Sequence, residues 1–180
     1  LASPAIGNRT SQEVLPMRQG LTQQLFLPNY DTDRDERAGL RILRGGALAV
    51  GDLTRMQRFA HDPATAVTFS GRHRIHLNVA ADEGSNRAFG VVAALVRCNV
   101  TTGVCTVVLS GRADTIGDAG DYEVRTIDLG RTDITLAAEE RLEVWITVDG
   151  ASTTDVRLAY DAGLYFSGWH KPLLFRGLLL

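Results

Sequence analysis

Three aspartates at alternate positions form the clearest chemical pattern in the sequence. Asp31, Asp33 and Asp35 stand in the segment NYDTDRDERAGLRI, residues 29–42. Alternate carboxylates can converge on a calcium ion, which takes about six to eight oxygen ligands. The segment departs from an EF-hand loop, because Glu36 replaces the turn glycine and Ile42 replaces the bidentate glutamate. It predicts a generic acidic loop for which calcium is one candidate ligand.

Nearby arginines give the alternative to calcium. On a strand, alternate carboxylates share one face, and their repulsion is relieved by a cation or by arginine side chains. The arginines close in sequence are Arg34, Arg37, Arg41 and Arg44. If calcium binds, Asn29 and the carbonyl of Tyr30 are further oxygen ligands. A glycosidase pair is not favoured, because that chemistry needs two carboxylates flanking a sugar at a defined separation.

Other catalytic patterns are absent from the sequence. It contains no G-x-S-x-G, H-E-x-x-H, phosphate-binding loop or dinucleotide fingerprint. His73 and His76 lie three apart in an alternating segment, which directs them to opposite faces of a strand. We therefore expect no catalytic residue, no certain cofactor and a protein that is not an enzyme.

Two cysteines flank a short loop between apolar, β-branched segments. Cys98 and Cys105 enclose NVTTGV, in which Gly103 favours a turn. Cysteines at facing positions of a hairpin reach disulfide geometry, with a pair of buried thiols as the alternative. A disulfide indicates an oxidising compartment, so we expect a secreted protein. The triplets at Asn8 and Asn99 also match the N-glycosylation pattern.

Aromatic side chains could provide a platform for sugars. In RLEVWITVDG, Leu142, Val144, Ile146 and Val148 alternate with polar residues and with Trp145. The alternation predicts that Trp145 lies on the face opposite the core, where a flat ring can stack on a sugar. Packing under a loop or against another subunit is the alternative. Further aromatic candidates are Tyr122, Tyr165 and Trp169.

The remaining pattern is that of an antiparallel β protein. Period-2 alternation recurs from residue 66 onward, with turn segments such as DEGSN and GDAGD between the strands. We expect an all-β, two-sheet, jelly-roll-like sandwich. GDLTRMQRFAHDP, residues 51–63, is the one candidate helix and is equally compatible with an edge strand. With 19 basic and 21 acidic residues, no nucleic-acid partner is favoured.

The two ends of the chain differ from the middle. We expect an extended arm over residues 1–22, the sandwich over 23–170 and an apolar tail over 171–180. The tail is too short for a transmembrane segment, which needs about 20 apolar residues. The arm offers apolar side chains that can enter pockets of a neighbouring sheet edge. These anchors are Leu1, Ala5, Ile6, Val14 and Leu15.

The segment LFLPNYDTDRDERAGLRI resembles a group of uncharacterised secreted bacterial proteins, of actinobacterial and Chloroflexi type, that share an NYDTDRD…GL segment. The similarity extends to LVRC with a second cysteine shortly after it, and to LAYD near the end. It implies a secreted β-sandwich, broadly like modules appended to extracellular hydrolases, and transfers no catalytic residue.

Our leading hypothesis from the sequence is a non-catalytic extracellular subunit of a filament, pilus or surface assembly. Its arm would contact neighbouring subunits, so self-association is expected. The alternative is a carbohydrate-binding module of the cell surface or of a secreted hydrolase, with polysaccharide as the partner.

Overall fold

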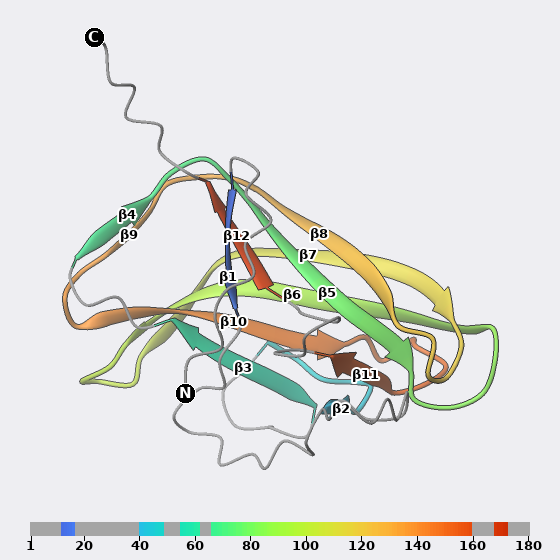
Figure 1. Cartoon of the computed structure of the whole chain (residues 1–180). Coiled ribbons are helices and arrows are strands. Elements are labelled where there is room, and N and C mark those ends of the chain that lie inside the picture. Colours follow the sequence, from blue (N-terminus) through green and yellow to red (C-terminus); the bar gives the residue numbers. More distant parts are fainter. Residues whose placement is uncertain (1–11, 17–39, 49–54, 62–65, 160–167, 173–180) are drawn as a thin grey trace, which may run out of the picture.

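The computed structural model describes residues 12–16, 40–48, 55–61, 66–159 and 168–172, and every regular element in these ranges is a β-strand (Figure 1). The strands are β1 Gln12–Pro16, β2 Leu40–Ile42, β3 Met56–His61, β4 Val67–Phe69, β5 Arg72–Ala81, β6 Arg87–Asn99, β7 Cys105–Gly117, β8 Glu123–Arg131, β9 Ile134–Leu136, β10 Glu140–Val148, β11 Val156–Ala159 and β12 Gly168–Pro172. The predicted all-β class is confirmed. Within the described ranges, no helix has the length and apolarity needed to cross a membrane.

Eight strands form the two layers of a sandwich. One layer has the order β2-β11-β5-β8 and the other has the order β3-β10-β6-β7, and all neighbours are antiparallel. This alternation of the chain between two four-stranded layers is the jelly-roll arrangement that the sequence predicts. β12 adds to β5 beside β11, and β1 adds to β12, so the first sheet has six strands.

A bent extension continues the first sheet at one end of the sandwich. β4 precedes β5 and β9 follows β8, and the two short strands pair with each other. Between the two ladders, the backbone N–H of Thr132 donates to the carbonyl of Gly71 at 3.0 Å. The β5–β8 pairing is thus carried through a bend, after which the chain enters β10 of the other sheet.

The main core lies between the two layers. Leu142, Val144, Ile146 and Val148 of β10 belong to it, and each is at most 6% exposed. The inward alternation predicted for β10 is therefore confirmed. Such side chains contribute about 1.5–3 kcal/mol each when fully buried.

One corner of the sandwich depends on a glycine. A Cβ at Gly111 of β7 would lie 2.8 Å from Cγ2 of Ile127 and 3.0 Å from the carbonyl oxygen of Asp128, both on β8. Only hydrogen fits at this distance, so Gly111 allows the outermost strands of the two layers to approach each other.

The segment 51–63 contains a strand. The helix considered for it is wrong, because β3 pairs with β10 over Met56–His61 as the first strand of its sheet. Met56 and Arg58 lie on the outer face and Phe59 on the core side, which is a two-residue period. The pairing of β3 with β10 therefore outweighs the local helix propensity of this segment.

Candidate functional site

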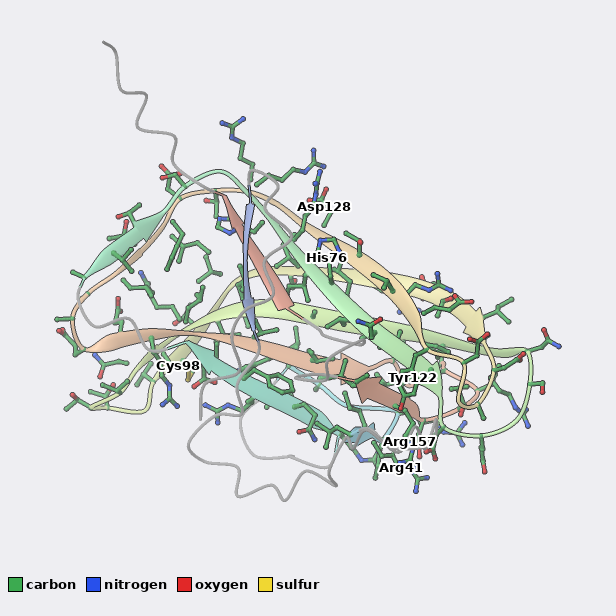
Figure 2. The ribbon with its side chains drawn as sticks, in the orientation of Figure 1. Arg41, His76, Cys98, Tyr122, Asp128 and Arg157 are labelled. Carbon is green, nitrogen blue, oxygen red and sulfur yellow. A yellow bond between two sulfur atoms is a disulfide. The ribbon has the colours of Figure 1, made fainter. Side chains whose placement is uncertain are left out.

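The disulfide predicted at the β6–β7 hairpin is confirmed. Cys98 and Cys105 are directly opposite in the ladder, with Cα atoms 4.1 Å apart and an S–S bond of 2.06 Å. Gly103 takes a positive φ of 72°, and the side chain of Asn99 accepts backbone hydrogen bonds from the turn. Figure 2 places Cys98 at one end of the sandwich.

The acidic loop and part of the arm lie outside the described residues. This applies to Asp31, Asp33 and Asp35, and to the arm anchors Leu1, Ala5 and Ile6. Calcium binding at the loop therefore stays a prediction. Among the residues that the structure does describe, no group of three or more His, Cys, Asp or Glu side chains could hold a metal ion.

The other two arm anchors lie in a strand. Val14 and Leu15 belong to β1, where their Cα partners are His170 and Trp169 of β12. β1 falls within the expected arm, and β12 crosses the expected boundary at residue 170. The described part of the arm therefore binds an edge of the chain's own sheet (Figure 1).

Trp145 is not an open platform. It lies on the face of β10 opposite the main core, as predicted, but its exposure is 2%. The ring packs in a second cluster on the outer face, and a sugar needs a free ring face. The open sugar platform expected at Trp145 is therefore wrong, because the ring packs mainly against residues of the neighbouring strands β3 and β6. The cluster contains Met56, Ala94, Val96, Cys98 and Trp145, with Leu48 and Cys105 partly buried against it.

A buried carboxylate organises the polar part of that face. Glu143 is fully buried, and its Oε2 accepts Arg58 Nε at 2.8 Å and Trp145 Nε1 at 2.6 Å. Its Oε1 accepts Arg58 Nη2 at 3.0 Å and Arg141 Nε at 2.8 Å. The Arg58 guanidinium also lies 5.0 Å from the centroid of the Trp145 ring, within cation–π range.

The pKa of Glu143 follows from this environment. Burial alone raises the pKa of the carboxyl, but the hydrogen bonds from Arg58 and Trp145 and the charges of Arg58 and Arg141 outweigh it. The pKa therefore lies below its ordinary value, and the group is a carboxylate at neutral pH. The alternation in β10 placed Arg141, Glu143 and Trp145 on the outward face, and it said nothing of Arg58. The apolar residues at successive positions of β6, typical of a strand buried on both faces, were the signal for a covered face.

A second ion network ties three strands of the other sheet together. Arg41 of β2 and Arg157 of β11 are opposite each other, so their like charges need compensation. Arg41 contacts Asp82 at 2.9 Å and Asp155 at 2.6 Å, and Arg157 donates to Asp82 at 2.5 Å. Figure 2 shows the two arginines close together. The network fastens β2 and β11 to the end of β5.

A polar strip follows the outer side of β5 and β8. His76 is half-buried, and its Nδ1 lies 2.8 Å from the hydroxyl of Thr126. Asp128 forms ion pairs with Arg72 and Arg74. Figure 2 labels Asp128 and His76 on this part of the sheet. Burial lowers the pKa of His76, and the charge of Arg74 lowers it further. The described polar groups of the strip thus bind one another.

No protein-family model and no curated protein matches the sequence. Two crystal structures of a CocE/NonD family hydrolase from Staphylococcus aureus are similar to the fold, each at 12% identity. One match covers 65% of this chain and 30% of the hydrolase chain, with a TM-score of 0.56. The other covers 90% and 36%, with a TM-score of 0.59. The chain thus spans about a third of these hydrolase chains, and the likeness shows the fold alone.

Proposed function

We propose that this chain is a non-catalytic, extracellular structural subunit that assembles by passing strand β1 to a neighbouring copy. The observation that carries the proposal is the position of β1, which is the outermost strand on its side of the sheet and pairs with β12 alone among the described strands. A strand held by one ladder can leave and re-form that ladder on another copy.

The exchange conserves the contacts of the strand. The register joins Gln12 to Pro172 and Pro16 to Gly168, and the same five residue pairs form whether β12 belongs to the same chain or to a neighbour. Domain swapping has a low cost for this reason. Head-to-tail repetition gives an open polymer unless the rotation between subunits closes a ring.

The connection after β1 is long enough for exchange. Residues 17–39 separate β1 from β2, and a fully extended chain of that length reaches about 75–80 Å. That reach exceeds the size of a small domain. The Cys98–Cys105 disulfide supports an extracellular setting, because disulfides persist in oxidising compartments.

Cysteine cross-linking of β1 to β12 tests the exchange. Val14→Cys and His170→Cys are combined in one chain, since these positions are Cα partners. After refolding at high protein concentration and oxidation, a non-reducing gel should show a ladder of cross-linked multimers. A mixture of the two single variants should give dimers that contain one copy of each.

The control pair is Gln12→Cys with Gly168→Cys, which lie on the same strands but are not register partners. This pair should give no ladder. If the Val14→Cys/His170→Cys protein yields only monomer with an internal cross-link at every concentration, β1 does not exchange and the proposal fails.

The β-sandwich fold is compatible with a second candidate function. In it, the sandwich is a carbohydrate-binding module of the cell surface or of a secreted hydrolase. Because Trp145 is buried, the polar strip along β5 and β8 is the surface to test. Retention on insoluble polysaccharides should fall for His76→Ala and Thr126→Ala. If neither the native protein nor any variant is retained on a polysaccharide, this candidate function is refuted.

A further inference from the structure

Strand β7 is a long edge strand with an exposed outer face. It forms the last strand of the order β3-β10-β6-β7, and its only described ladder is with β6. β8 approaches it from the core side at Gly111, yet no ladder or backbone hydrogen bond joins β7 to β8 among the described residues. A bulge interrupts the ladder opposite Leu95 and Val96, and the pairing beyond it is regular to Gly117.

The hydrogen bonds of Gly90 show which backbone groups of β7 face away from β6. The N–H of Gly90 donates to the Ser152 hydroxyl at 3.1 Å, and its carbonyl accepts the N–H of Asp149 at 2.9 Å. Both groups therefore point to the β10 side, and Asp114, which is opposite Gly90, directs its own N–H and C=O outward. Every second residue does the same. The set is Ser110, Arg112, Asp114 and Ile116.

The same four residues are exposed, and two of them carry opposite charges. Ile116 is 63% exposed. The Arg112 side chain is 45% exposed and lies 2.7 Å from Asp114, and it also contacts Asp149. An arginine and an aspartate thus flank Ala113 symmetrically on the free edge.

This symmetry selects a register for pairing with a second copy. If two copies pair antiparallel about a two-fold axis at position 112, Arg112 of one copy lies opposite Arg112 of the other. If the axis is at position 114, Asp114 lies opposite Asp114 of the other copy. About an axis at Ala113, each Arg112 faces Asp114 of the other copy, and these residues direct their backbone groups to the interface.

We infer that β7 binds β7 of a second copy of this chain, antiparallel, with the two-fold axis at Ala113. Residues 109–117 then face the same residues of the other copy, and Ser110 lies opposite Ile116. Any extended peptide could pair with a bare edge, but the order Arg-Ala-Asp is complementary to itself. The interface is independent of β1 exchange.

Mixed cysteine variants of the full chain test this register. Ser110→Cys is mixed with Ile116→Cys, and oxidation should yield cross-linked dimers that contain one of each. Neither variant alone should cross-link, because positions 110 of the two copies are about 20 Å apart in this register. Absence of the mixed dimer overturns the inference. The readout involves neither β1 nor β12, so its failure and that of strand exchange are distinguishable.

Charge reversal supplies the second arm of the experiment. In the same cysteine backgrounds, Asp114→Arg places like charges opposite each other and should lower the cross-linking yield at least about tenfold. The double change Arg112→Asp/Asp114→Arg restores unlike pairs and should return the yield to within about twofold. Arg72→Asp is the control, since it reverses an exposed charge on β5. Equal yields for the single and double reversals would also overturn the register.

Discussion

Replacing Glu143 should destabilise the fold more than any other single change of a charged side chain proposed here. Glu143→Gln keeps the size of the side chain but removes the charge that Arg58 and Arg141 share. The side chains of Arg58 and Arg141 are 8% and 11% exposed, so water cannot take over that role. The variant leaves two guanidinium groups buried without a carboxylate.

The magnitude follows from the burial of the pair. Removing one partner of a buried ion pair costs about 3–5 kcal/mol, whereas exposed pairs contribute about 0–1 kcal/mol. For a domain of this size, a loss of that order lowers Tm by about 10 °C or more. Glu139→Gln, on the exposed turn before β10, should change stability by less than about 0.5 kcal/mol.

Urea denaturation followed by tryptophan fluorescence measures the effect, because the Trp145 indole donates directly to Glu143. In the double-mutant cycle, Arg58→Met with Glu143→Leu should lose less stability than the sum of the single changes, since the Arg58 guanidinium is then not left buried without its carboxylate. Arg141 loses its partner equally in Glu143→Leu and in the double variant. A Glu143→Gln protein that folds and loses less than about 1 kcal/mol would refute the reasoning.

The acid limb of the stability curve gives a second check. The pKa of Glu143 is lowered in the folded state, so the unfolded chain binds its proton first as the pH falls. The contribution of Glu143 is complete above its ordinary pKa of 4.5 and is lost as the pH falls through the lower folded value. Glu143→Gln should therefore flatten the loss of stability below pH 4.5.

Three further predictions concern other parts of the fold. Replacing Cys98 and Cys105 by serine should cost about 2 kcal/mol in thermal unfolding, because the disulfide closes a short loop; an unchanged Tm would contradict this. Gly111→Ala should cost about 1–3 kcal/mol in urea, since its Cβ meets the backbone carbonyl of Asp128; a cost below about 0.5 kcal/mol would mean that β8 can shift. Burial holds the pKa of His73 below 6.5, although the Thr132 carbonyl and the Asp133 charge act to raise it, so the free energy of unfolding should fall as the pH drops below 6.5. His73→Gln should reduce the difference between the urea midpoints at pH 7.5 and pH 5.5. An unchanged difference would refute the assignment.

The fold could be predicted where one face of a strand is apolar and the other is polar. In β10 and β5 the two-residue period specifies which side chains enter the core, and the ladder and burial agree with it. The disulfide between Cys98 and Cys105 could also be predicted, because a single short hairpin brings the two cysteines opposite each other. For the segment 51–63 the sequence left a helix and an edge strand open, and the edge strand is confirmed. The choice could not be made from the sequence, because the ladder between β3 and β10 joins residues more than 80 apart.

The environment of Trp145 could not be predicted from alternation. Alternation tells which face a residue occupies, but the burial of that face depends on the neighbouring strands. β6 supplies Ala94 and Val96 beneath the ring, and β3 supplies Met56 and Arg58. The ion network around Glu143 likewise joins β3 to β10 and requires the register of that pair.

The exposed edges of the two sheets are consistent with the contacts proposed at β1 and β7. A sandwich has exposed edges that proteins usually protect with short strands, bulges, charges or cover. β2 is short and is fastened by Arg41 to Asp82 and Asp155. In β3, Met56, Gln57, Arg58 and Phe59 are all buried. β1, β7 and β8 remain as edges of the described sheets without a further strand. The β5–β8 ladder shifts register between His73 and Arg74, whereas the β6–β7 ladder is regular over residues 109–117 of β7.

The proposed contacts at β1 and β7 have different symmetries, and these symmetries determine the assembly that the two contacts form together. Head-to-tail passing of β1 gives a polymer with a direction, because donor and acceptor are different surfaces. Two-fold pairing at β7 uses the same surface on both copies and reverses that direction. With both contacts, two polymers that run in opposite directions are joined at every subunit. Blocking β7 by Asp114→Arg should then leave single polymers, whereas locking β1 within its own chain should leave dimers.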